Sequence, residues 1–110
     1  MNNQNPKIYL LCYRDDVFDG QYEHEDHKHK DEFVYFGYDR LGILEPVDFH
    51  YAAIFTSKDD VLKEFKNSKK FQNNSRFSRY FKHTHLFEDH LKTDKGCGKM
   101  FIEQYRLPQR

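Results

Sequence analysis

Histidines and acids gather in one short stretch of the chain, and their types suit metal binding. The candidate ligands are Glu23, His24, Glu25, Asp26, His27 and His29. Imidazole and carboxylate side chains bind zinc and other divalent ions. However, the adjacent Lys28 and Lys30 oppose a cation, and a loop without apolar periodicity does not hold ligands in place. We therefore predict a solvated loop and no metal site, with His24, His27 and His29 as the remaining candidates.

A second group of potential ligands lies nearer the C-terminus and consists of His83, His85, His90 and Cys97. Residues two apart on a helix point roughly 200° from each other, so His83 and His85 cannot share an ion there. Cys97 lies between two glycines, but the chain has no GxSxG, P-loop, GxGxxG or HExxH motif. We predict no catalytic residue and no cofactor.

Basic residues recur at helical spacing between Asn74 and Lys92. Successive residues 100° apart place one set on an apolar side: Phe77, Tyr80, Phe81, Thr84, Phe87 and Leu91. The opposite side carries the basic set: Arg76, Arg79, Lys82, His83 and His90. We expect this basic side to be a solvated face, and the alternative is a site for phosphate or nucleic acid.

Aromatic residues are concentrated in two predicted strands, residues 7–14 and 32–39, which are apolar on both faces. One face is expected to carry Tyr9, Tyr13, Phe33 and Tyr35. The other should pack beneath the helices through Ile8, Leu10, Val34 and Phe36. An uncovered aromatic face could stack nucleic-acid bases or dock a protein. Since no RNP-type motif is present, the preferred interpretation is a second core layer, closed by the long loop or by a dimer partner.

Two helices and further strands must position these residues. Ser57 followed by Asp60 is a capping-box pattern, which predicts a helix from Ser57 to about residues 67–70. A second helix should run without interruption over 74–92, with Asn74 or Ser75 as its N-cap. Residues 43–47 suggest a short piece at an edge because of Pro46. Residues 50–56 suggest either a third strand or an irregular run into the helix, and 99–107 the last strand.

The order of these elements predicts one domain over residues 1–110, with a flexible leader at 1–6 and a long charged loop at 15–31. The expected fold is α+β: a small antiparallel sheet of three to four strands with two helices packed on one face, in the order β-β-β-α-α-β.

Composition limits the classes of function. The 110 residues include 11 Phe and 8 Tyr, enough aromatic surface for one core. Eighteen basic and eighteen acidic residues cancel, which argues against strong non-specific nucleic-acid binding. Two cysteines, Cys12 and Cys97, are too few for a disulfide scaffold, so we expect free thiols in a reducing compartment. No apolar run could span a bilayer and no signal peptide is apparent, so a cytoplasmic location without membrane contact is expected.

The leading functional hypothesis is a small non-enzymatic binding protein that associates with a protein partner and can form a homodimer. Its class would be the accessory proteins of bacteria or phages, including inhibitors of defence nucleases. The predicted partner-binding residues are Tyr9, Tyr13, Tyr22, Tyr35, Glu23 and Asp26. One alternative is a nucleic-acid-binding module that uses the basic helix side. The other is a metal-dependent hydrolase that uses the histidine clusters.

Overall fold

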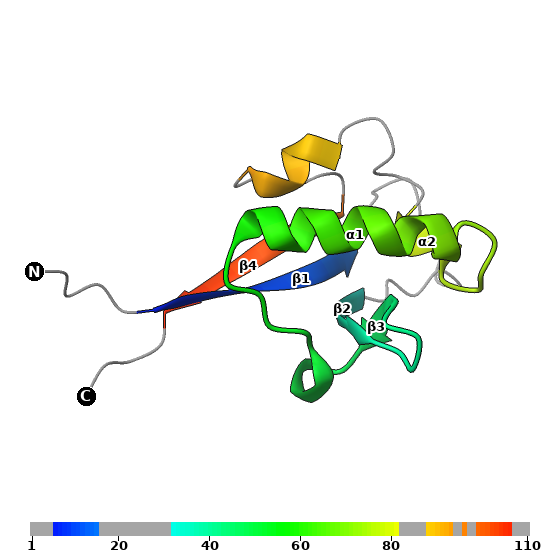
Figure 1. The fold of residues 1–110 in the computed structure, drawn as a ribbon, viewed down its shortest axis with the longest axis horizontal. Helices are drawn as coiled ribbons and strands as arrows, with labels where there is room; N and C mark the ends of the chain where they lie inside the picture. The colour runs from blue at the N-terminus through cyan, green and yellow to red at the C-terminus, as the bar shows by residue number, and fades with distance from the viewer. Residues whose placement is uncertain (1–5, 16–31, 82–87, 94–95, 97–98, 107–110) are drawn as a thin grey trace, which may run out of the picture.

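The computed structural model describes residues 6–15, 32–81, 88–93, 96 and 99–106. Within these ranges the chain forms a four-stranded antiparallel sheet with helical segments, which confirms the predicted α+β class and element order (Figure 1). The strands are β1 (Lys7–Asp15), β2 (Glu32–Tyr38), β3 (Leu44–Val47) and β4 (Met100–Arg106). The helical segments are η1 (Phe49–Tyr51), α1 (Lys58–Gln72), α2 (Ser78–Phe81) and η3 (Glu88–Lys92).

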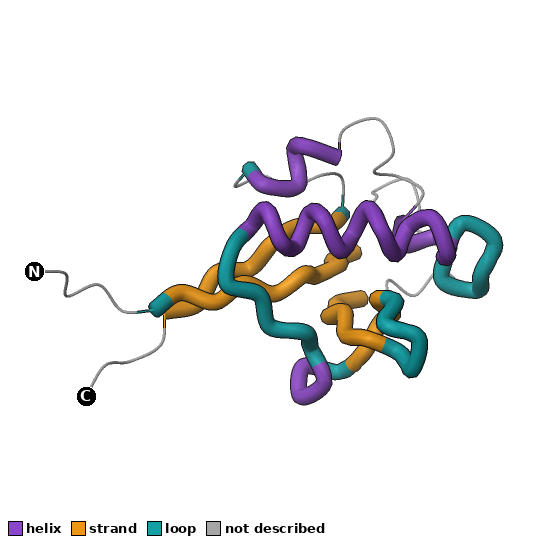
Figure 2. Tube along the Cα trace, in the orientation of Figure 1, coloured by secondary structure: helices purple, strands orange, loops and turns teal. Residues whose placement is uncertain are grey.

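The strands lie in the order β3-β2-β1-β4, so the first two strands of the chain form the centre of the sheet. Tyr13 is opposite Val34 of β2 and Met100 of β4, and β1 and β4 run together as a long ribbon (Figure 2). Residues 50–56 form no strand of the sheet. The backbone of Ala53 bonds β2 and that of Phe55 bonds β1, so this segment bridges the two central strands, which corresponds to the irregular run considered above.

Helix α1 begins as the sequence predicts. The Ser57 hydroxyl accepts a 3.1 Å hydrogen bond from the Asp60 N–H, which satisfies one of the free donors of the first turn. The helix continues to Gln72, two residues beyond the predicted limit at Lys70. The extension buries Gln72 against β3, where its side-chain amide donates a 2.8 Å hydrogen bond to the Leu44 carbonyl.

The continuous helix predicted over 74–92 is wrong at both of its described ends. Residues 73–77 form turns, α2 begins only at Ser78, and residues 88–92 are a 3₁₀ helix. The cause is local: the Ser75 hydroxyl donates to the Gln72 carbonyl and accepts from the Phe77 N–H, at 3.2 and 3.0 Å. Such side-chain bonds to the nearby backbone compete with helix. Residues 82–87, with Thr84 and Phe87, lie outside the described ranges.

The described residues on the apolar side predicted for 74–92 nonetheless pack into the core as expected. Tyr80, Phe81 and Leu91 are buried, and Phe77 is partly buried against the same cluster. The Phe81 ring stacks on Phe65 of α1 with a centroid separation of 5.3 Å. The core therefore lies between α1, α2 and η3 and one face of the sheet.

The predicted faces of β1 are inverted, whereas those of β2 are correct. Tyr13 is buried beneath the helices, where its ring meets Tyr80 edge-on at 4.7 Å, and Tyr9 packs partly buried against the same core. Ile8 and Leu10 therefore point to the opposite face, because side chains alternate along a strand. Val34 and Phe36 of β2 lie on the helix side as predicted, with Phe36 fully buried.

Candidate partner-binding site

The sheet face opposite α1 carries an aromatic surface, which we call the open face. The strand register places three groups of residues on it: Ile8, Leu10 and Cys12 from β1, Phe33 and Tyr35 from β2, and Phe101, Glu103 and Tyr105 from β4. Cys12 lies directly between Tyr35 and Phe101, and Leu10 is opposite Glu103. The phenols of Tyr35 and Tyr105 and the carboxylate of Glu103 thus lie on the same face as the aliphatic side chains of β1.

The η1 turn adds Phe49 to the open face. Its ring lies 5.1 Å from Tyr35 and 6.4 Å from Tyr105, both in edge-to-face geometry. The turn is held close to β2 at Gly37, where an added Cβ would lie 2.2 Å from the Tyr51 carbonyl oxygen. Glycine is therefore required at position 37 for η1 to approach the sheet, and this contact sets where Phe49 sits.

A hollow of about 270 Å³ opens beside these rings. It is lined by Ile8, Leu10, Phe49, His50, Ala52, Ile54 and Tyr105. Phe49 and Ile54 remain 54% and 65% exposed, although both are large apolar side chains. The hollow has the size of a few side chains and, with no Lys, Arg, Asp or Glu in its lining, offers mainly apolar contact.

Glu103 is connected to this hollow through Tyr105, one of the residues that line it. Its Oε1 accepts a 2.9 Å hydrogen bond from the Tyr35 phenol and a further one from Tyr105. No hydrogen bond to its Oε2 is formed within the described ranges. The bond to Glu103, followed by burial, raises the pKa of Tyr105; burial and the bonds to Tyr105 and Glu103 raise that of Tyr35. Both phenols therefore stay protonated and hold the carboxylate in place.

Cys12 lies beneath the aromatic layer and is a free, fully buried thiol, as expected for this residue. Burial raises its pKa, with a further contribution from Glu103. Since the thiolate is the reactive form, Cys12 is protected from nucleophilic chemistry. Cys97 lies outside the described residues.

The predicted partner-binding residues are divided by the structure. Tyr35 lies on the open face, whereas Tyr9 and Tyr13 are on the helix side and Tyr13 is 3% exposed. Tyr13 thus cannot serve as a surface contact in this fold. Tyr22, Glu23 and Asp26 fall outside the described ranges.

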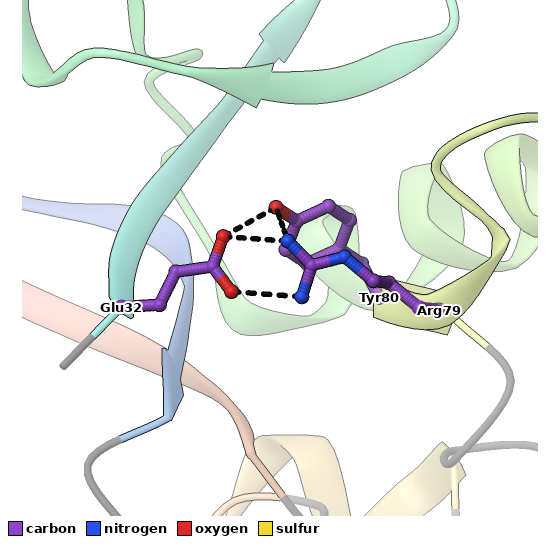
Figure 3. A network of polar contacts seen from close by, with 3 residues as sticks. All are labelled: Glu32, Arg79 and Tyr80. Atoms are coloured by element: carbon purple, nitrogen blue, oxygen red, sulfur yellow. Dashed lines mark hydrogen bonds and ion pairs between the residues drawn. The ribbon is translucent and has the colours of Figure 1, made fainter. Parts of the chain in front are cut away.

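Three of the predicted phosphate-binding residues, Arg76, Arg79 and His90, lie in the described ranges, and all three are exposed. The Arg79 guanidinium makes two hydrogen bonds of 2.8 and 2.7 Å to the Glu32 carboxylate and also contacts the Tyr80 phenol (Figure 3). Its charge is compensated within the fold. Arg76 is exposed over the Phe77 ring, at 4.8 Å, and His90 is exposed on η3. Lys82 and His83 are outside the described part of the chain.

The described residues contain no set of ligands for a metal ion. No group of three or more His, Cys, Asp or Glu is placed to hold an ion among residues 6–15, 32–81, 88–93, 96 and 99–106. His24, His27, His29, His85 and Cys97 lie beyond these ranges. Within the same ranges, none of the helices has the length and apolar character required to cross a bilayer.

Sequence reasoning missed Phe49, Ile54, Glu103 and Tyr105. A signal for two of them was present, because Phe101, Glu103 and Tyr105 alternate along the last predicted strand and must share a face. Phe49 and Ile54 carry no such signal. They reach the open face through the course of the segment between β3 and α1, which depends on long-range contacts with β1 and β2.

No protein-family model matches the chain, and neither the curated proteins nor the solved structures include a significant match. The site's geometry is therefore the basis for a functional proposal.

Proposed function

We propose that this protein is a small non-enzymatic binding protein that docks another protein on the open face of its sheet. The partner would insert an aliphatic or aromatic side chain into the hollow beside Phe49 and place a basic side chain next to Glu103. By covering a surface of that partner, the protein would act as an accessory or inhibitory factor. The observation that carries the proposal is the exposed apolar hollow whose lining residue Tyr105 is hydrogen-bonded to the Glu103 carboxylate.

Apolar exposure supports a protein as the partner. Phe33, Phe49 and Ile54 are each more than two-fifths exposed, and the hollow accepts side chains in a preformed depression. Aromatic side chains that surround a pocket are typical anchors of protein interfaces, where a few buried contacts supply most of the affinity.

Charge supports a basic rather than an acidic or phosphate-bearing partner. Glu103 keeps Oε2 without a hydrogen bond from the described residues, so it can accept one from an arginine or lysine. A charge-assisted bond of this kind is stronger than a neutral one. The same carboxylate would repel a nucleic-acid backbone, whose binding requires neutralising positive charge.

The test is selection of binders from a displayed library of random peptides, followed by affinity measurements with the selected peptides. We expect enrichment of sequences that combine a large apolar residue with an arginine or lysine. Phe49→Ala should weaken their binding by about tenfold or more, and Glu103→Gln should weaken it several-fold and reduce its salt dependence. Ile54→Ala provides a second test of the hollow.

Leu41→Ala is the matched control, because Leu41 is an apolar residue that is 83% exposed in the turn between β2 and β3. It should leave peptide affinity unchanged. Each variant is first shown to unfold with a cooperative thermal transition. Peptides that bind Phe49→Ala and Glu103→Gln as tightly as the original protein would refute the proposal, and so would a single-stranded oligonucleotide that binds more tightly than any peptide.

A further inference from the structure

The two edges of the sheet differ in how their backbone groups are satisfied. β3 forms one edge and β4 the other. At the β3 edge, the Leu44 N–H donates a 2.8 Å hydrogen bond to the Ser68 hydroxyl, and the Leu44 carbonyl accepts one from Gln72. Pro46 has no N–H to present. Side chains of α1 and a proline therefore block this edge against another strand.

At the start of β4, Gly96 lies against the Met100 carbonyl, but over residues 102–106 no described side chain or proline blocks the edge. The Arg14 N–H donates to the Lys99 carbonyl at 2.9 Å, which identifies these two as a hydrogen-bonded pair of the antiparallel ladder. Hydrogen-bonded pairs alternate along such a ladder. Phe101, Glu103 and Tyr105 consequently direct their backbone groups toward β1, whereas Ile102, Gln104 and Arg106 direct theirs away from the sheet.

The hydrogen bonds on the other side of β1 independently show that the backbone groups of Gln104 point outward. Tyr9 is opposite Gln104, and both backbone groups of Tyr9 bond Phe55 on the far side of β1, at 2.9 and 3.0 Å. Tyr9 therefore has no backbone group left for Gln104. Gln104 and Arg106 are also exposed, and β4 contains no proline or glycine, so their outward N–H and carbonyl groups are available to another strand.

We propose that β4 pairs antiparallel with β4 of a second copy of this chain and joins two sheets into one. A row of outward donors and acceptors along a sheet edge is a template for pairing with another strand. An identical strand fits when the twofold axis passes through Gln104. In that register Glu103 stands opposite Tyr105 of the second copy, Ile102 opposite Arg106, and Gln104 opposite Gln104. No like charges then face each other.

Neighbouring registers are less favourable. An axis through Glu103 would place the two Glu103 carboxylates directly opposite, which destabilises a strand pair. An axis through Ile102 would place Glu103 against the Phe101 ring. The register centred on Gln104 avoids both of these arrangements. The pairing involves backbone groups at the sheet edge and does not depend on the function proposed for the open face.

Sedimentation equilibrium of the full chain tests the dimer. We expect a mass of twice 13.5 kDa at high protein concentration. Gln104→Pro removes an outward N–H without removing a bond to β1, so it should weaken dimerisation by about tenfold or more while thermal unfolding stays cooperative. Gln104→Lys places two like charges opposite each other, and the resulting loss of dimer should diminish at high salt.

Leu41→Lys is the control, because it adds the same charge far from β4 in the turn between β2 and β3 and should leave the dimer intact. A protein that remains monomeric at all concentrations overturns the proposal. A dimer that keeps its affinity in both Gln104→Pro and Gln104→Lys overturns it as well, since another surface would then form the contact. Failure of peptide binding to the open face would leave this result unaffected.

Discussion

The Tyr80 phenol donates a 2.7 Å hydrogen bond to Oε2 of Glu32, so α2 is fastened to the first residue of β2. Arg79 binds the same carboxylate and lies 4.2 Å over the Tyr80 ring. These three residues form a closed network of charge and hydrogen bonds at the end of the sheet (Figure 3). The network explains why the helical turn at Ser78–Phe81 sits on β2 although it is only four residues long.

The first prediction concerns alkaline pH. Burial, followed by the hydrogen bond to Glu32, raises the pKa of Tyr80 from 10.0 to about 12. The folded protein therefore holds this proton more tightly than the unfolded chain does. The stabilisation from Tyr80 is complete below pH 10 and is lost as pH rises toward 12.

Tyr80→Phe should cost on the order of 1 kcal/mol in the free energy of unfolding at neutral pH, because it removes the hydrogen bond to Glu32. This difference from the original protein should shrink as the pH passes from 10 to 12. Denaturant titrations across this range measure it. Tyr51→Phe, at a side chain that is 74% exposed, serves as the control. A constant difference at every pH would contradict the assignment.

The second prediction concerns the two buried polar side chains of α1. Ser68 and Gln72 bond the N–H and the carbonyl of Leu44, and all three residues are buried. Ser68→Ala and Gln72→Ala would each leave one backbone group of Leu44 without its partner. Each should lower the free energy of unfolding by about 1–3 kcal/mol. Asn67→Ala, on the exposed side of the same helix, should change it by less than about 0.5 kcal/mol.

Hydrogen exchange provides a more specific measurement than stability. In Ser68→Ala the Leu44 amide should exchange faster relative to its neighbours, because its acceptor is gone. In Gln72→Ala the Leu44 amide keeps that acceptor, so the relative change there should be smaller. Equal exchange of this amide in both variants would show that the two side chains are not independent anchors of β3.

The architecture could be predicted because its signals are local. The Ser57–Asp60 cap, the apolar periodicity of α1 and the runs of strand-forming residues each specify an element without reference to the others. The hydroxyl of Ser57 does accept from Asp60, and β2 begins at the predicted residue, Glu32. Element order then sufficed for the α+β class.

The sequence could not predict which face of β1 packs against the helices, because both alternating sets of its side chains are apolar. Tyr9, Leu11 and Tyr13 are as apolar as Ile8, Leu10 and Cys12, so either set could have met the helices. The choice is made by contacts distant in sequence, chiefly Tyr13 with Tyr80 and the pairing of Tyr13 with Val34. Since the open face depends on this choice, the candidate site was only partly predicted, through Phe33 and Tyr35.

The third prediction concerns Gly37. A Cβ at this position would lie 2.2 Å from the Tyr51 carbonyl oxygen and 3.1 Å from Val47. Because the first contact is with backbone, Gly37→Ala must displace η1 and should lower the free energy of unfolding by about 1–3 kcal/mol. The displacement should also move Phe49 and weaken peptide binding at the open face.

Gly42→Ala is the matched control for this effect. Gly42 has a φ of 79° but nothing within 4 Å of an added Cβ, so alanine there should cost only the backbone strain of about 1–2 kcal/mol. Peptide affinity should then stay unchanged. If Gly37→Ala retained full peptide affinity, the contact with Tyr51 would not be what positions Phe49.

The fourth prediction concerns the carboxylate on the open face. Glu103 accepts hydrogen bonds from Tyr35 and Tyr105, and the bond to Glu103 is the largest cause of the raised pKa of Tyr105. In Glu103→Gln the negative charge is gone and the side chain keeps its size. The pKa of Tyr105 should therefore fall toward the usual tyrosine value, with a smaller fall for Tyr35, where burial is the largest cause. Tyrosinate absorbance during alkaline titration measures both.

Tyr38 is the control, because its hydroxyl donates to Glu64 elsewhere in the molecule. It should keep its raised pKa of about 12 in this variant. A fall in the pKa of Tyr38 as well would mean that the substitution perturbs the whole fold and not this face alone.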